Sequence, residues 1–410
     1  LQDEAMLAAL VFGATSFYNF PAGTLGGVLG GLKRHDAESR LHIVVAVLQA
    51  VGQAAAAFAG LGLLAVVIAF NAPQYIRPWV RLRIIRRMIP DFRISPRLFS
   101  RATLREIGGY SVWSFMVDLG RNVVGNFGIV VVASFLGPAT AASYNIGTQV
   151  GRLLQRMTLP VAFVLLPLAS EFDATGDRRA ARRLIERASR YTTAISIALA
   201  GPLIVLAPDV IRVWLGEPLP LAVDVARIFL VVSVFLMVRA PLSNVLEGSA
   251  GGVRTAGIWI ALESVASIAL SIVLVQTGGA RGAVLGVLAA VVLASVVGII
   301  PAALRRYDIG VPEYLRASAL PPLVPLAVAV LPWLGIAYAV SGRGLVVVLA
   351  GLAASIAVYL VAFWFLLPRR ERDDLGPALL GRFGLRRSDA RRSTGSDQPG
   401  RGSRETPVRR

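Results

Sequence analysis

The sequence predicts an all-α, polytopic membrane protein, because its composition and its apolar segments fit no soluble fold. Hydrophobic residues make up 55% of the 410 residues, charged residues only 16%, and the mean hydropathy is +0.66. One or two soluble domains could not bury that much apolar surface. Several segments also reach the roughly 20 residues of helix that span the hydrocarbon core of a bilayer. A soluble enzyme is therefore excluded.

Eleven segments meet this length and composition, and they follow one another with short connections. They cover residues 5–32, 41–59, 62–80, 107–136, 141–170, 191–207, 221–246, 255–275, 282–304, 319–340 and 345–367. The chain has no cysteine and only two histidines, His35 and His42. No acid–nucleophile set, metal-ligand spacing or cofactor motif accompanies them. We therefore expect no enzyme activity, no metal site and no cofactor.

The positive charge of the chain follows the expected topology. The net charge is +18, and Lys33 is the only lysine among 42 basic residues. Of these 42, 34 lie in alternate connections and in the tail, four lie in the opposite connections and four lie inside spans. Basic residues accumulate on the cytoplasmic side of a membrane protein. We therefore expect a multi-pass membrane protein with a cytoplasmic C-terminus, and no nucleic-acid partner.

Two hydrophilic segments differ in pattern from the spans. The stretch from Arg77 to Glu106 carries three apolar side chains at helical spacing, Val80, Ile84 and Met88, interleaved with arginines. This pattern is typical of an amphipathic helix on an anionic membrane surface, with anionic lipids as partners, although a solvated basic linker fits it equally well. Residues 368–410 are rich in Arg, Gly, Ser and Asp, which predicts a disordered cytoplasmic tail.

An internal repeat relates two parts of the chain. The segment PAGTLGGVLGGLKR begins at Pro21, and PLSNVLEGSAGGVR begins at Pro241, an offset of 220 residues. At the same offset, Gly62 corresponds to Gly282 at the start of a later span. Repeated helical bundles that enclose a central site are typical of secondary transporters. The repeat therefore predicts a two-lobe helical transporter.

The repeat also predicts how the chain is divided. Residues 1–80 form an incomplete N-terminal lobe of three spans, and residues 81–106 form the basic cytoplasmic connection. Residues 107–306 form a six-helix C-terminal lobe, residues 319–367 form two additional helices, and residues 368–410 form the tail. At an offset of 220, the first three spans of the C-terminal lobe have no counterpart in the N-terminal lobe, so we expect this chain to hold about 11 of a total of 14 transmembrane helices.

Three local patterns of small and polar residues stand out in the spans. They are GGYSVWSFMVDLGRNVVGNFGIVVVASFLGPATAASYNIGTQVGRLLQ, LPLASEFDATGD and PLSNVLEGSAGGVR. With these patterns the chain resembles the polysaccharide-repeat flippases of the multidrug/oligosaccharidyl-lipid/polysaccharide exporter superfamily. Together with the topology, the resemblance covers about residues 5–367. It implies a fourteen-helix protein of the bacterial cytoplasmic membrane that flips an undecaprenyl-pyrophosphate-linked oligosaccharide across this membrane by alternating access, for polysaccharide or lipopolysaccharide biosynthesis. Polysaccharide polymerase machinery would be a further partner.

Polar residues inside two adjacent spans are the candidate substrate site, because charges at membrane depth are costly unless they face protein or water. In the span over 141–170, helical spacing places four residues on a single face: Asn145, Gln149, Arg152 and Arg156. In the preceding span, Asp118, Asn122 and Asn126 share a face, and Arg121 lies beside Asp118. Guanidinium groups suit pyrophosphate, because they donate two parallel hydrogen bonds and stay charged. The predicted substrate-binding residues are Arg121, Asn122, Asn126, Asn145, Gln149, Arg152 and Arg156.

Three other charged residues inside spans have two interpretations. Arg239 and Glu263 are expected at similar depth on consecutive spans, where they would form an ion pair. Asp118 lies three residues before Arg121, close enough to neutralise it along the helix. Alternatively, Glu263 or Asp118 carries a coupling proton, since desolvation raises the pKa of a carboxyl group.

Two other functions remain alternatives to flipping. A drug or ion antiporter of the same superfamily would rely on carboxylates inside the membrane, whereas arginine outnumbers acid among the charges inside these spans. A membrane polymerase or ligase of the polysaccharide pathway would need an external active site, and the expected external connections, such as 136–141, are short.

Overall fold

The structure is a computed structural model that describes residues 2–32, 34–95, 99–175, 178–249 and 251–367. Within these residues the secondary structure is helical and contains no strand, which confirms the predicted all-α fold class. The chain forms two compact units, Leu1–Ala102 and Thr103–Arg410, and each is described by itself. The predicted disorder of the tail concerns residues outside the described part of the chain.

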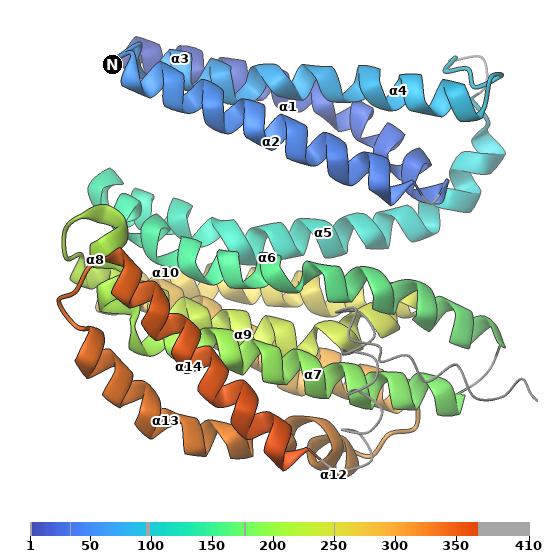
Figure 1. Cartoon of the computed structure of the whole chain (residues 1–410). Coiled ribbons are helices and arrows are strands. Elements are labelled where there is room, and N and C mark those ends of the chain that lie inside the picture. The colour runs from blue at the N-terminus through green and yellow to red at the C-terminus, as the bar shows by residue number, and fades with distance from the viewer. Residues whose placement is uncertain (1, 33, 96–98, 176–177, 250, 368–410) are drawn as a thin grey trace, which may run out of the picture. The chain divides into compact units, whose positions relative to one another are not determined.

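The first unit consists of three helical passes. They are α1 (Gln2–Gly31), α2 (His35–Phe58) and a third pass made of α3 (Gly62–Asn71), the 3₁₀ turn η1 (Ala72–Tyr75) and α4 (Ile76–Met88). The third pass runs nearly in line in Figure 1. Gly60 and Gly62, both with positive φ, turn the chain between α2 and α3.

The basic helix α4 packs against α1, whereas a helix that only lies on a membrane surface would have no such contact. The sequence predicted a span over 62–80 and a separate amphipathic helix, but η1 interrupts the apolar run at Ala72, next to Pro73, and α4 continues the pass. Ile85 of α4 is fully buried against Leu25 and Leu29 of α1. One face of α4 is therefore a packing face, and its contact with anionic lipids stays a prediction.

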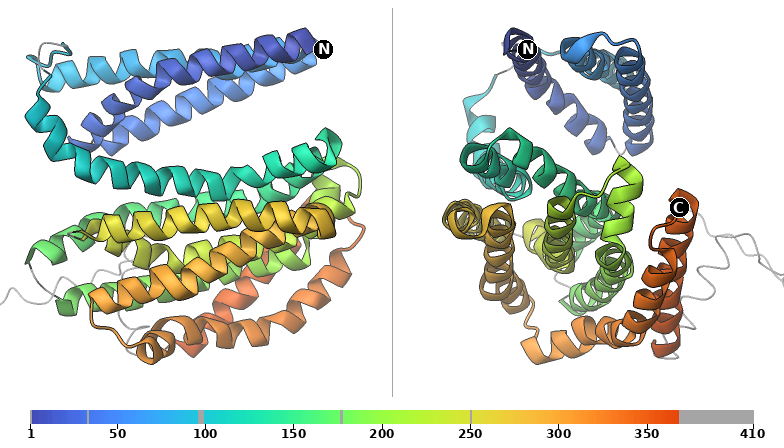
Figure 2. Two further views of the ribbon diagram at one scale, coloured as in Figure 1. Left: turned by 180° about the vertical axis from the view of Figure 1, so that it is seen from behind. Right: turned by 90° about the vertical axis from the view of Figure 1, so that its left-hand side faces the viewer.

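The second unit is built around a central helix, α9 (Pro220–Gly248). Apolar residues lie on every side of this helix, as expected of a helix surrounded by others, and it packs against α6 (Pro138–Thr175), α7 (Arg178–Val205) and α10 (Gly252–Leu293). Figure 2 shows these helices end-on. On α6, Gly147 and Gly151 lie where α9 approaches most closely, since a Cβ at Gly147 would lie 2.6 Å from the carbonyl oxygen of Ala222.

The helix labelled α10 contains a chain reversal. Gly279 has φ 58° and ψ −145°, which is not a helical conformation. The hydroxyl of Ser271 donates to the carbonyl of Ala283 across the two arms at 2.9 Å. The second arm continues through the π-helix η3 (Ala294–Ile299) into α11 (Ile300–Arg306). The two arms agree with the separate spans predicted over 255–275 and 282–304.

The remaining helices complete the second unit. α5 (Arg101–Leu136) precedes α6, and the short helix α8 (Ala207–Leu215) follows α7. After α11 the chain forms α12 (Val311–Tyr314), a π-helical turn η4 (Leu315–Ala319), α13 (Leu320–Val340) and α14 (Leu345–Leu366). The last two helices pack against each other and against α7 (Figure 1).

Seven helical segments among the described residues are long and apolar enough to cross a membrane. One of them, Gly252–Arg306, holds both arms of the reversal at Gly279. The third pass of the first unit is not among the seven, because α3 is only 10 residues long before η1 interrupts it. The polytopic membrane fold is therefore observed, while eleven spans is an approximate number.

The helix order agrees with the 220-residue repeat. Shifted by that offset, α1, α2 and the third pass of the first unit fall on α9 and on the two arms of α10 with α11, within a few residues. The third member of each set is interrupted, by η1 in one case and by the π-helix η3 in the other. The two sets therefore share the position of a helix break as well as their order.

Candidate functional site

The predicted polar residues of α5 lie along one side of that helix. Asp118, Arg121, Asn122 and Asn126 are all exposed. The amide of Asn122 donates to the carbonyl of Asp118 at 2.8 Å, and the amide of Asn126 donates to the carbonyl of Asn122 at 3.1 Å. Bonds to the carbonyl four residues earlier hold the side chains close to their own helix. The side-chain amide oxygens of Asn122 and Asn126 remain on the polar side of α5.

Arg152 of α6 connects the polar rows of α5 and α6. Its Nη1 donates to Asn126 Oδ1 at 2.8 Å and to the carbonyl of Gly125 at 3.2 Å. Its Nη2 donates to Asn145 Oδ1 at 2.7 Å and to Thr148 Oγ1 at 2.6 Å. All four acceptors are neutral oxygens, so the guanidinium is hydrogen-bonded but keeps its full charge. The structure thus brings Asn126, Asn145 and Arg152 together.

Arg156 and Gln149 of α6 are exposed and differ from Arg152 in their contacts. Neither side chain has a hydrogen bond or an ion pair with any described residue. Arg156 lies 18 residues after Pro138, or about 27 Å along the helix, close to the middle of α6. The polar face of α5 and α6, defined by Asn122, Asn126, Asn145, Gln149, Arg152 and Arg156, therefore carries one cation at mid-helix with no protein partner among the described residues.

Arg121 pairs with a carboxylate that the sequence analysis did not identify. Its Nη2 lies 2.5 Å from Glu247 Oε1 on α9, and its Nη1 lies 4.0 Å from Asp118 Oδ1 on its own helix. Ser243 also donates to Glu247 Oε1, at 2.8 Å. The main partner of Arg121 is therefore Glu247, and this ion pair joins α5 to α9. The sequence contains only a weak signal for a polar role of Glu247: Ser243 lies four residues before it, on the same face of one helix.

Arg239 and Glu263 form an ion pair inside the second unit. Two hydrogen bonds join them, at 2.5 Å from Nη1 to Oε2 and at 2.8 Å from Nη2 to Oε1, and the exposed side-chain fractions are 6% and 0%. Arg239 also donates to Ser295 Oγ at 3.2 Å, on the π-helix η3. A bidentate geometry with both partners buried is the arrangement in which such a pair is well compensated.

The electrostatics of this region favour an anion. Arg152 and Arg156 have no carboxylate partner among the residues that the structure describes, while Arg121 shares Glu247 and Asp118. No group of three or more His, Cys, Asp or Glu side chains that could hold a metal occurs in the described ranges. Long apolar helices that carry arginines and amides near their middle define the class of a multi-pass membrane protein with polar residues inside its spans.

Comparison with known proteins gives the family. Residues 7–220 match the polysaccharide biosynthesis protein family, so the chain belongs to that family. No curated protein sequence matches it. A similar solved structure is the lipid II flippase MurJ in an inward closed conformation, with a TM-score of 0.55 and 17% sequence identity. The similarity covers 83% of this chain and 67% of that one, and it shows a MurJ-like fold.

Proposed function

We propose that the protein flips an undecaprenyl-pyrophosphate-linked oligosaccharide across the bacterial cytoplasmic membrane by alternating access, with its C-terminus in the cytoplasm. Membership of the polysaccharide biosynthesis protein family supports the pathway. The likeness to a structure named as a lipid II flippase supports the kind of transport. The polar face of α5 and α6 supports the kind of substrate, because it offers cations and amides rather than carboxylates.

The observation that carries the proposal is Arg156. A cation at mid-depth of a spanning helix costs several kcal/mol unless water or a counter-charge compensates it. Arg156 is exposed and has no counter-charge among the described residues. A pyrophosphate supplies that charge, and a guanidinium fork matches its oxygens in a bidentate manner. Arg156 therefore contacts the pyrophosphate, and Gln149, one turn away, contacts the sugar or the phosphate oxygens.

Arg152 has a positioning role. Four hydrogen bonds to α5 and α6 fix its guanidinium, so it holds the two helices at one spacing and adds positive potential. The substrate meets an arranged surface, which avoids the cost of ordering side chains on binding. The lipid chain stays in the bilayer while the head group moves along Asn122 and Asn126.

Proton coupling through Glu263 has little structural support. Both of its oxygens accept from Arg239, and its side chain is fully buried. Asp118 is 71% exposed, so it is the better carboxylate for exchange of a proton with solvent. A structural ion pair for Arg239 and Glu263 is the simpler role, and the drug or ion antiporter alternative is correspondingly weakened. We also propose contact with polysaccharide polymerase machinery, which acts in the same pathway.

Binding of undecaprenyl pyrophosphate to the purified full chain in detergent tests the role of Arg156. A hydrogen bond to a charged group contributes about 1.5–3 kcal/mol, so Arg156→Gln should weaken binding at least about tenfold. Undecaprenol, which lacks the phosphates, should bind wild type and variant equally. Arg343→Gln is the matched control, because Arg343 is exposed and lies outside the polar face.

The same variants test function in cells that depend on this protein for surface polysaccharide. Arg156→Gln should abolish display of the polysaccharide while its abundance in the membrane stays normal, and Arg343→Gln should leave display unchanged. Full display by the Arg152→Ala, Arg156→Ala double variant would refute the assignment of the polar face.

A further inference from the structure

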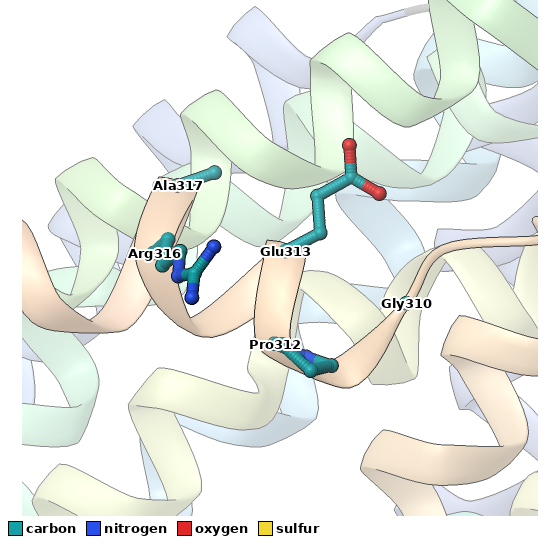
Figure 3. Close-up of a pocket in the computed structure, with 5 residues that line it drawn as sticks. All are labelled: Gly310, Pro312, Glu313, Arg316 and Ala317. Atoms are coloured by element: carbon teal, nitrogen blue, oxygen red, sulfur yellow. The ribbon is translucent and has the colours of Figure 1, made fainter.

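A pocket of about 650 Å³ lies at the segment that leads into α13, away from the polar face of α5 and α6. Figure 3 shows the five residues that line it, which come from α12, from η4 and from the glycine before them: Gly310, Pro312, Glu313, Arg316 and Ala317. Arg316 is its only basic lining residue. The guanidinium is exposed and has no ion pair or hydrogen bond with any described residue.

The carboxylates near this pocket are already engaged by α7. Glu313 pairs with Arg182, which also donates to Glu186 at 3.1 Å. Asp308 lies 2.6 Å from Arg178. Arg190 donates from Nε to the carbonyl of Ala317 at 2.6 Å, which fixes the wall of the pocket. Because these carboxylates pair with arginines of α7, none of them forms an ion pair with Arg316.

The surroundings of the pocket are strongly basic. The sequence between positions 178 and 190 contains six arginines and one carboxylate, and the sequence between 305 and 316 contains three arginines and two carboxylates. The contacts between α7 and the α12 region place both segments at one end of the second unit. An anionic group is therefore attracted to this end of the molecule.

An exposed apolar strip continues from Arg316 along α13. Leu320 and Leu323 follow at steps of four and three residues, so they share a face of the helical path with Arg316. Their side chains are 49% and 45% exposed. The strip belongs to a segment, Val311–Val340, that is long and apolar enough to cross a membrane. A cation at the start of such a strip matches a lipid with a charged head and apolar chains.

We propose that this pocket binds an anionic phospholipid of the surrounding bilayer, with the lipid phosphate on the Arg316 guanidinium and the acyl chains along Leu320 and Leu323. The site is distinct from the polar face that we assign to the transported substrate, and it does not depend on that assignment. Its ligand is a resident lipid that holds the start of α13 at the membrane surface. The apolar strip favours a lipid over a free phosphate ion.

Retention of phospholipid by the purified full chain tests this site. The protein is exchanged into nanodiscs of equal parts phosphatidylglycerol and phosphatidylcholine, extracted, and the lipids that stay bound are quantified by mass spectrometry. Wild type should retain phosphatidylglycerol in preference to phosphatidylcholine. One arginine at a membrane surface contributes a roughly fivefold preference, so Arg316→Gln should lower the preference about fivefold.

Two further variants separate the site from general charge and from misfolding. Arg343→Gln, which removes one exposed arginine beyond the other end of α13, should keep the preference of wild type. Ala317→Phe keeps every charge but fills the pocket, and it should lower the preference as Arg316→Gln does. Equal preferences in wild type and Arg316→Gln, or equal losses in Arg316→Gln and Arg343→Gln, would overturn the proposal. Full displacement of the lipid by 10 mM inorganic phosphate, roughly a physiological level, would show a phosphate site instead and would also overturn it.

Discussion

Arg152 and Arg156 lie one turn apart on α6 and illustrate how different the setting of two arginines at membrane depth can be. Arg152 donates to four neutral oxygens on two helices, whereas Arg156 has no partner among the described residues. Helical spacing alone placed both on one face. It could not distinguish them, because the partners of Arg152 include a backbone carbonyl, Gly125, that no side-chain pattern reveals.

The pair of Arg239 and Glu263 makes a sharp prediction at the residue scale. Removing one partner of a buried ion pair leaves an uncompensated charge and costs about 3–5 kcal/mol, whereas replacing both by apolar residues is close to neutral. We expect Glu263→Leu to lower the thermal midpoint of unfolding in detergent more than the double variant Arg239→Met, Glu263→Leu. A double variant less stable than the single one would show that the charges themselves are needed.

Glu247 shows what sequence reasoning missed at this scale. It is the second-last residue of α9, a position expected to be close to the membrane surface. The structure places its carboxylate 2.5 Å from Arg121, which lies well inside α5. Helix tilt and the offset between α5 and α9 decide that contact, and neither is encoded in the spacing of apolar residues.

At the scale of elements, the two arms of α10 were predicted well, because the break between two apolar segments coincides with a pair of glycines. The expected boundary between 275 and 282 contains Gly278 and Gly279. By contrast, α8 was not predicted, because its nine residues are too short to span a bilayer and lie in an expected external connection. The helix that contains the predicted span over 191–207 begins earlier, because the basic start of α7 at Arg178 is also helical and pairs with Glu313 and Asp308.

The reversal in α10 depends on one glycine. The φ of 58° and ψ of −145° at Gly279 lie in a region that is essentially restricted to glycine, so a side chain there costs about 1–3 kcal/mol of backbone strain. Gly279→Ala should lower the thermal midpoint in detergent. Gly278→Ala is the control, because Gly278 has no positive φ and a Cβ there would meet no atom within 4 Å. Equal midpoints for the two variants would contradict the assignment of the turn to Gly279.

At the scale of the whole molecule, the fold class was more predictable than the contacts between side chains. The apolar fraction and the arginine distribution predicted a polytopic helical protein, and the described helices agree with it. The charge pattern also predicts sidedness. It assigns the α13–α14 turn, with Arg343, to the outside, and the α7 and α11 ends to the cytoplasm.

The absence of cysteine from the sequence makes this sidedness straightforward to measure. Ser341→Cys introduces a single thiol in the α13–α14 turn, and Ser388→Cys introduces one in the tail. A membrane-impermeant maleimide should label Ser341→Cys in intact cells and Ser388→Cys only after permeabilisation. The reverse pattern would invert the proposed orientation.

The neutral partners of Arg152 have a consequence for a protein that separates two compartments of different acidity. Amide, hydroxyl and backbone oxygens do not titrate between pH 4 and pH 9, and arginine stays protonated throughout. The link between α5 and α6 is therefore independent of a proton gradient, whichever side of the membrane the face meets. Any response of transport to pH must arise from other groups, among which Asp118 is the most accessible carboxylate near this face.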